Sequence, residues 1–156
     1  MFVLTAKVSK TKLAAIVVLL IAIVVGIVML SVGSVGGGAG QTPEGIPGDS
    51  EDARLSFLAQ HGWNVNATPI KTQQVVIPED PEDEIFRRYN ALQTAQGFDL
   101  SALSGQTVMR YVYEILNYPD ATEPVYATVF VKDGVIVGGD VTNTAPDGKM
   151  HGFDLP

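Results

Sequence analysis

The feature that most constrains this chain is an uninterrupted apolar run near its N-terminus, from Leu13 to Leu30. As a helix, with a rise of about 1.5 Å per residue, this run is about 27 Å long. Extended to residue 33, it matches the roughly 30 Å hydrocarbon core of a bilayer. The sequence therefore predicts a transmembrane helix over residues 13–33, with the lipid bilayer as its surroundings.

The charges on either side of this run predict its orientation. Lys7, Lys10 and Lys12 precede the run, and the first acidic residue of the chain is Glu44. Positively charged flanks stay on the cytoplasmic side of a membrane. We therefore expect residues 1–12 to be a cytoplasmic basic segment and the rest of the chain, beyond the span, to be extracellular.

Two other interpretations of the apolar run remain open. A cleaved signal peptide has an apolar region of about 7–15 residues that ends at a small-x-small cleavage site. Here the run is longer, and the nearest candidate site lies several residues beyond it, in residues 34–40. The third interpretation is a buried core helix. We favour a retained signal anchor of a single-pass membrane protein; with either an anchor or a cleaved signal, the folded part is exported.

The exported part is strongly acidic. It contains all 17 Asp and Glu residues and all basic residues except the three N-terminal lysines, which gives it a formal charge of −10. Such a surface repels phosphate, so nucleic acids and anionic lipid headgroups are not expected partners. The charge suits cationic partners, but it is also a common means of solubility. The chain has no cysteine, which excludes disulfides, thiol chemistry and cysteine-based metal sites.

Composition divides the exported part into a linker and a domain. Residues 34–49 are rich in Gly and contain Pro43 and Pro47, as expected for a flexible tether. Residues 50–156 have the size of one domain with one core. We therefore expect the chain to contain one extracytoplasmic domain.

Two helices are expected in this domain. Ser50 is a good N-cap for the first helix, and Gly62 is placed to end it. The second helix is expected to begin at Asp80-Pro81, with Asp80 as its cap, and to end at Gly97. Its apolar stripe is predicted to contain Ile85, Phe86, Tyr89 and Leu92.

Four strands are expected, over residues 71–77, 107–117, 125–132 and 135–142. Asp133-Gly134 predicts a two-residue hairpin turn between the last two strands. Counting outward from this turn pairs Phe130 with Val137, Val129 with Gly138, and Ala127 with Asp140. The same count places Val141 on the face that carries Tyr126, Phe130 and Val137. The fold class is therefore α+β, a two-layer domain with two helices packed on one face of an antiparallel sheet of about four strands.

The residues that could support catalysis form no familiar motif. His61 suits the C-terminal end of the first helix, and the pattern around His151 lacks the ligand spacing of a zinc site. A carboxylate pair of Glu114 and Asp140, assisted by His151, is the candidate for an envelope hydrolase. In the simpler interpretation, which we favour, Glu114 pairs with Arg110 or another basic residue. No metal and no cofactor are expected.

The candidate partner-binding residues are Tyr118, Gly138, Gly139, Asp140 and His151. Adjacent glycines within a strand mark a bulge or a close approach of another group. At Gly138-Gly139 that group is either the second helix or Trp63, which we favour, or a peptide or ligand. Tyr118 lies in the turn Asn117-Tyr118-Pro119, where an aromatic side chain can contact a partner.

Several of these segments resemble the bacterial domain-of-unknown-function family 4830. The resemblance lies in Gln96-Gly97-Phe98-Asp99-Leu100, Arg110-Tyr111-Val112-Tyr113-Glu114, Asn117-Tyr118-Pro119, Gly138-Gly139-Asp140 and Asp147-Gly148-Lys149-Met150-His151-Gly152. It covers residues 50–155. It implies a short membrane protein of Gram-positive bacteria, mainly gut anaerobes, with one C-terminal domain, and it transfers no activity and no functional residue.

The sequence therefore favours a membrane-anchored, non-enzymatic domain outside the cell that binds a protein or peptide. Binding is expected either by strand addition at an open sheet edge or by docking at Tyr118 and the glycine pair. The alternatives are the hydrolase with Asp140, Glu114 and His151, and a structural or sensory module of the cell envelope.

Overall fold

The computed structural model describes residues 45–155 of the chain. The predicted cytoplasmic segment and transmembrane helix, together with most of the predicted linker, lie outside the described residues. Within residues 45–155, no helix has both the length and the apolar character needed to cross a membrane.

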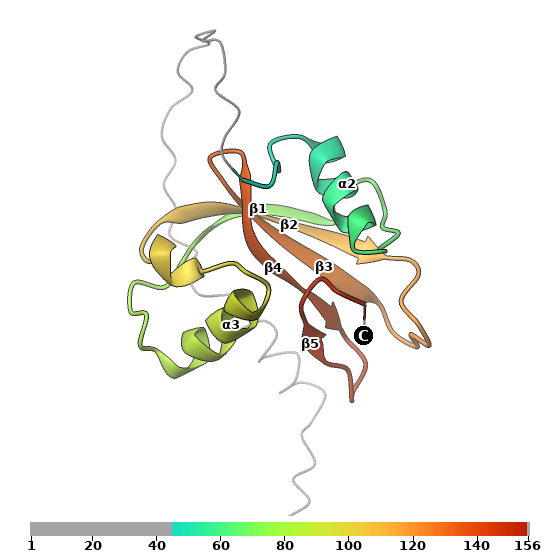
Figure 1. Cartoon of the computed structure of the whole chain (residues 1–156). Coiled ribbons are helices and arrows are strands. Elements are labelled where there is room, and N and C mark those ends of the chain that lie inside the picture. Colours follow the sequence, from blue (N-terminus) through green and yellow to red (C-terminus); the bar gives the residue numbers. More distant parts are fainter. Residues whose placement is uncertain (1–44, 156) are drawn as a thin grey trace, which may run out of the picture. The chain divides into compact units, whose positions relative to one another are not determined.

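The described residues form an α+β domain around one antiparallel sheet (Figure 1). The order of elements is α2 (Glu51–Gln60), β1 (Lys71–Val76), α3 (Glu84–Ala95), a short 3-10 helix η1 (Leu100–Leu103), β2 (Thr107–Ile115), β3 (Val125–Lys132), β4 (Val135–Asn143) and β5 (Met150–His151). The strands lie in the sheet in sequence order, from β1 to β5. The α+β class is confirmed. The fifth strand was not predicted, because its two residues carry no strand pattern.

The two helices cover opposite faces of the sheet, so the prediction of a single covered face was wrong (Figure 1). Phe57 and Leu58 of α2 pack on one face, in a cluster with Tyr113 of β2. Phe86 of α3 packs on the other face, in a cluster with Val108. Alternate residues of a strand point to opposite faces. Because the central strands are apolar on both faces, each face needs its own cover.

The first predicted helix is confirmed at both ends. The hydroxyl of Ser50 accepts a hydrogen bond from the backbone N–H of Ala53 at 3.1 Å, as an N-cap does. At the other end, Gly62 has a φ of 85°, the left-handed conformation that terminates helices and suits glycine.

The second helix differs from the prediction in its start and in its buried face. Its N-cap is Asp83, which accepts from the N–H of Phe86 at 2.9 Å. Asp80 instead accepts from the N–H of Glu82 in the preceding turn. The buried residues of α3 are Phe86 and Gln93, whereas Ile85 is 52% exposed. A polar side chain has thus taken a core position that the apolar pattern did not assign to it.

The β3–β4 hairpin is confirmed near its turn and wrong beyond it. Asp133 and Gly134 have φ angles of 50° and 81°, as the predicted turn requires. The register shifts after Val131, so that Phe130 pairs with Gly138. Such a bulge moves every later residue of β4 by one position.

The shift replaces all three predicted pairs. Besides the pair of Phe130 and Gly138, Val129 pairs with Gly139 and Ala127 pairs with Val141. Val141 therefore lies in the core under α2, with Val129 and Ala127, and not on the face of Phe130.

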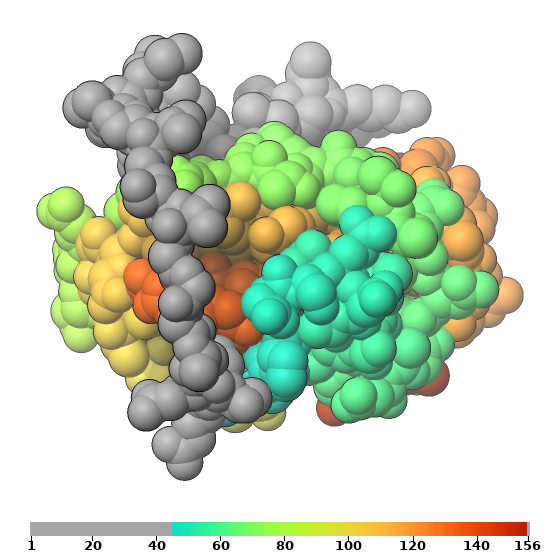
Figure 2. Space-filling view, turned by 90° about the horizontal axis from the view of Figure 1, so that it is seen from above, coloured from blue at the N-terminus to red at the C-terminus, as the bar shows by residue number. Residues whose placement is uncertain are grey.

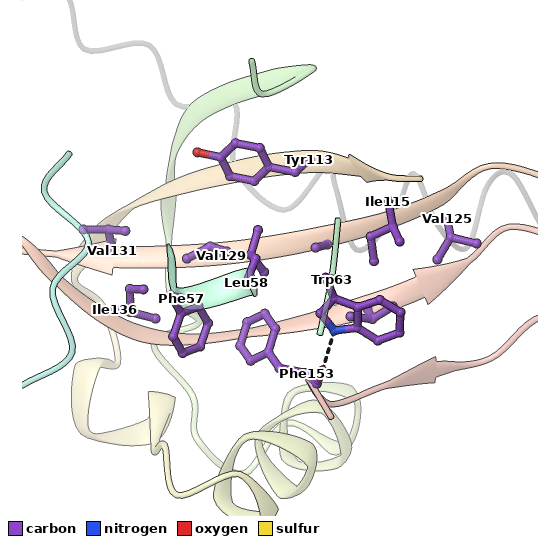
Figure 3. Packing of buried hydrophobic residues seen from close by; sticks show 12 residues of the cluster. Phe57, Leu58, Trp63, Tyr113, Ile115, Val125, Val129, Val131, Ile136 and Phe153 are labelled. Atoms are coloured by element: carbon purple, nitrogen blue, oxygen red, sulfur yellow. Dashed lines mark hydrogen bonds between the residues drawn. The ribbon is translucent and has the colours of Figure 1, made fainter. Parts of the chain in front are cut away.

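The C-terminal segment completes the core on the α2 face. Phe153 is 1% exposed and lies edge-on to Phe57, with their ring centres 4.8 Å apart. The indole N–H of Trp63 donates a hydrogen bond to the carbonyl of Phe153 (Figure 3). Phe153 thus connects α2 to the part of the sheet where the two glycines lie.

Candidate functional site

The two edges of the sheet differ in whether other segments of the described chain cover them, and this difference defines the candidate site. An edge strand exposes unpaired N–H and C=O groups that can pair with another strand. At the β4 edge, a segment before α2 pairs with the start of the strand. Ile136 donates its N–H to the carbonyl of Ile46 at 2.8 Å, and Gly48 donates to the carbonyl of Gly134 at 2.9 Å. Contacts of the domain therefore begin before Ser50.

The guanidinium group of Arg54 holds this segment in place from α2. Its Nη1 donates to the carbonyl of Gly48 at 2.8 Å, and its Nε donates to the hydroxyl of Tyr113 at 2.9 Å. The charge lies 3.8 Å above the centre of the Tyr111 ring. The buried cation therefore fastens one end of the β4 edge to the core.

At its other end the β4 edge is closed by β5. Val141 pairs with His151, and Asn143 donates its N–H to the carbonyl of Lys149 at 3.1 Å.

In the middle of β4, two glutamine side chains make the hydrogen bonds that a neighbouring strand would make. They belong to Gln93 in α3 and to Gln96, the C-cap residue of this helix. The carboxamide oxygen of Gln93 accepts the N–H of Gly139 at 2.8 Å, and the carboxamide nitrogen of Gln96 donates to the carbonyl of Gly139 at 3.2 Å. Gln96 also accepts the N–H of Phe153 at 2.7 Å. Both backbone groups of Gly139 are thereby satisfied, and the β4 edge is closed along its length.

This arrangement explains the adjacent glycines. A Cβ atom on Gly138 would lie 2.6 Å from the carboxamide oxygen of Gln93. A Cβ atom on Gly139 would overlap the carbonyl oxygen of Thr128 and the ring of Phe153. The close approach that the sequence indicated at this pair is therefore made by α3 and the C-terminal segment.

Asp140, the next residue, is 4% exposed and points toward α3. The hydroxyl of Tyr89 donates to its carboxylate at 2.7 Å, and the hydroxyl of Thr142 donates at 2.8 Å. Burial raises the pKa of Asp140. Burial also raises the pKa of Tyr89, and the negative charge of Asp140 raises it further. Ionised Asp140 therefore opposes folding, and this cost is lifted as the pH falls through its raised pKa.

Tyr118 and His151 are brought together at the other end of the sheet. The Tyr118 ring stacks on Trp63, with ring centres 5.6 Å apart and planes 4° from parallel. Its hydroxyl lies 3.2 Å from Nε2 of His151, whose Nδ1 lies 2.7 Å from the carbonyl of Gly152. In the neutral ring, Nδ1–H donates to this carbonyl and Nε2 accepts from Tyr118. The half-buried Tyr118 thus fastens β5 to Trp63.

The three residues considered for hydrolysis do not meet. His151 pairs with Val141 and so shares the α2 face, whereas Asp140 lies on the α3 face. Glu114 is bonded to the side chain of Asn66 at 2.7 Å. Its strand lies two places from β4, and it is level with Thr142, two residues along β4 from Asp140; this puts its Cα about 12 Å from that of Asp140. Within residues 45–155, no three His, Asp or Glu side chains lie close enough to hold a metal ion.

The β1 edge, by contrast, is open. Ile77 donates its N–H to Gln106 of the chain leading into β2 at 2.9 Å, which sets the alternation along β1. Residues 73 and 75 therefore direct their backbone groups toward β2, and Thr72, Gln74 and Val76 direct theirs away from it. No other residue of the described part of the chain forms a backbone hydrogen bond with these three. They make up the candidate site, which we term the open edge.

The sequence did not identify Gln93 and Gln96 as important residues. The available signal was their spacing, since residues three apart share a helix face. Together with a glycine pair in a strand, this spacing indicates side chains that approach a bare backbone.

Comparison with known proteins identifies one family. The family model described as Domain of unknown function (DUF4830) matches residues 57–141, which is more than half of the chain. The match ends within β4, before β5 and Phe153. Comparisons with curated proteins and with solved structures give no match.

The role of Gln93 can be tested by the substitution Gln93→Met, which keeps the size of the side chain and removes its acceptor. The N–H of Gly139 then stays buried without a partner, which costs roughly 1–3 kcal/mol. We expect a loss of about 1–2 kcal/mol, because the substitution also removes the Gln93 amide nitrogen, which has no hydrogen-bond partner among the described residues. Urea unfolding of the detergent-solubilised full chain, followed by the fluorescence of its single Trp, measures this loss.

The control is Gln60→Met in α2, where the side chain is exposed. This change is expected to alter the free energy of unfolding by less than about 0.5 kcal/mol. Equal effects of the two substitutions would show that the Gln93 carboxamide does not stabilise the sheet edge.

Proposed function

The chain belongs to the domain of unknown function family DUF4830, and from its sequence and its open edge we propose that it is a single-pass membrane protein whose extracytoplasmic domain binds an extended segment of a protein at that edge. Binding takes place by strand addition, in which the segment becomes a further strand of the sheet next to β1.

The sequence supports the membrane part of this proposal. The apolar run is long enough to span a bilayer, its basic flank precedes it, and all acidic residues follow it. A Gly-rich tether then leaves the domain free to reach a partner near the membrane.

The observation that carries the binding part is the contrast between the two sheet edges. Proteins protect sheet edges with charges, prolines, bulges or covering segments. The β4 edge has three such covers: the segment around Gly48, the carboxamides of Gln93 and Gln96, and β5. Along β1, Lys71 at its first position is the only charged residue, and no proline lies within the strand. The sheet is therefore closed on one side and able to accept a strand on the other.

The arrangement of the polar residues also favours binding over hydrolysis. Asp140, Glu114 and His151 are each engaged separately, by Tyr89, Asn66 and Tyr118 respectively. A general acid and base must reach one substrate. Glu114 and Asp140 share one face of the sheet but lie about 12 Å apart, and His151 lies on the other face.

The membrane topology has a direct test. Protease added to intact cells that express the full chain is expected to digest the acidic C-terminal half, because that half lies outside the cell. An antibody against a tag fused to Pro156 measures the loss. A C-terminal half that survives in intact cells and is digested only after lysis would contradict the proposed topology.

Strand addition has a separate test by photo-crosslinking in membranes. A photoreactive phenylalanine derivative in place of Gln74 is expected to give several-fold more protein adducts than the same group in place of the exposed Thr94 on α3. The further substitution Val76→Pro is expected to reduce the adducts at position 74. It removes an outward N–H without breaking a β1–β2 hydrogen bond.

The two positions serve as matched probes of an edge and a helix surface. Similar adduct yields at positions 74 and 94, or a yield at position 74 that Val76→Pro leaves unchanged, would rule out strand addition at this edge.

A further inference from the structure

We propose that the segment bound at the open edge is β1 of a second copy of this chain. The two β1 strands pair antiparallel about a twofold axis through Gln74 and join two five-stranded sheets into one. This inference rests on the proposed function and names the partner of the same edge.

The alternation of backbone groups selects one register. In an antiparallel pair, residues that exchange both hydrogen bonds lie directly opposite each other. An axis through Gln74 places Thr72 opposite Val76 of the second copy and Gln74 opposite its own counterpart. All three outward residues of each copy then take part, with about six hydrogen bonds in total. A shift by two residues in either direction leaves only about four.

The charges near the edge also suit this register. Lys71 lies opposite Ile77 of the second copy, and the two copies of Lys71 are about 20 Å apart. Lys71 is the only charged residue of β1, so this register brings no two acidic residues of the strand together, although the domain as a whole is acidic.

The side chains and the surroundings of β1 fit the same arrangement. Thr72, Gln74 and Val76 share the α2 face of the sheet, and the two Gln74 carboxamides meet on the axis, where each can donate to the other. β1 runs along one margin of this face (Figure 2).

Two copies anchored in one membrane by the same segment have a raised effective concentration, which favours pairing through a modest contact.

The absence of cysteine allows a register-specific test in the full chain. The substitution Gln74→Cys is introduced, and membranes are treated with a mild oxidant. The two Cα atoms at position 74 are about 5.5 Å apart in a hydrogen-bonded pair, which is within the range of a disulfide. We expect a disulfide-linked dimer at a yield at least fivefold above that of the control variant.

The control variant is Thr72→Cys, whose two copies lie about 14 Å apart in this register and cannot link. Co-expression of Thr72→Cys with Val76→Cys, each with its own tag, is expected to restore a linked dimer. Trp63 fluorescence confirms that each variant is folded.

A linked dimer from Gln74→Cys and from the mixed pair, but not from Thr72→Cys alone, supports the inference. Equal yields from Gln74→Cys and Thr72→Cys, or none from Gln74→Cys, overturn it. If position 74 still photo-crosslinks to proteins of other masses, self-pairing is wrong and strand addition stands. If position 74 gives neither disulfides nor photo-adducts, both proposals fail.

Discussion

The structure depends on the hydrogen bonds between two glutamine carboxamides and the backbone of Gly139. A side-chain amide has the same donor and acceptor groups as a peptide bond, so Gln93 and Gln96 do for β4 what a neighbouring strand would do. This requires a bare backbone at Gly138 and Gly139 and a helix α3 turned with its glutamines inward. It also explains why a polar residue, Gln93, is fully buried in the domain.

Other features of the fold follow from this contact. Phe153 donates its N–H to Gln96 and places its ring against Gly139, so that the C-terminal segment is held between the two helices. β5 and the stacked pair of Trp63 and Tyr118 extend the same closure to the end of β4. The result is a sheet whose last full-length strand is sealed. The first strand is left to pair outward, and this asymmetry is the physical basis of the proposed function.

Much of the fold could be predicted because it depends on local chemistry. Ser50, Gly62 and Asp133-Gly134 are caps and a turn whose conformations follow from their own side chains or from the lack of one. The register beyond Val131 could not be predicted, because a bulge is decided by what packs against the strand. The buried face of α3 was missed for the same reason, since the apolar pattern gave Gln93 no role.

The candidate site was predictable only in part. The sequence predicted binding at an open sheet edge but not which strand forms it. The residues of the open edge depend on the strand order, which places β1 outermost. Of the single residues proposed for binding, Tyr118 and His151 meet each other, while Asp140 lies on the opposite face with Tyr89. Paired residues so distant in the sequence leave no pattern in a single chain. The transmembrane helix remains a prediction from hydropathy and charge.

The most direct measurement is residue-resolved amide hydrogen exchange of the full chain in micelles, at a dilution where it is monomeric. The N–H of Gly139 is expected to exchange slowly, because Gln93 accepts it. On β1, the N–H groups of Gln73 and Val75 are expected to exchange slowly and that of Gln74 rapidly. Rapid exchange at Gly139, or equal protection of Gln74 and its two neighbours, would contradict a sheet that is sealed at β4 and open at β1.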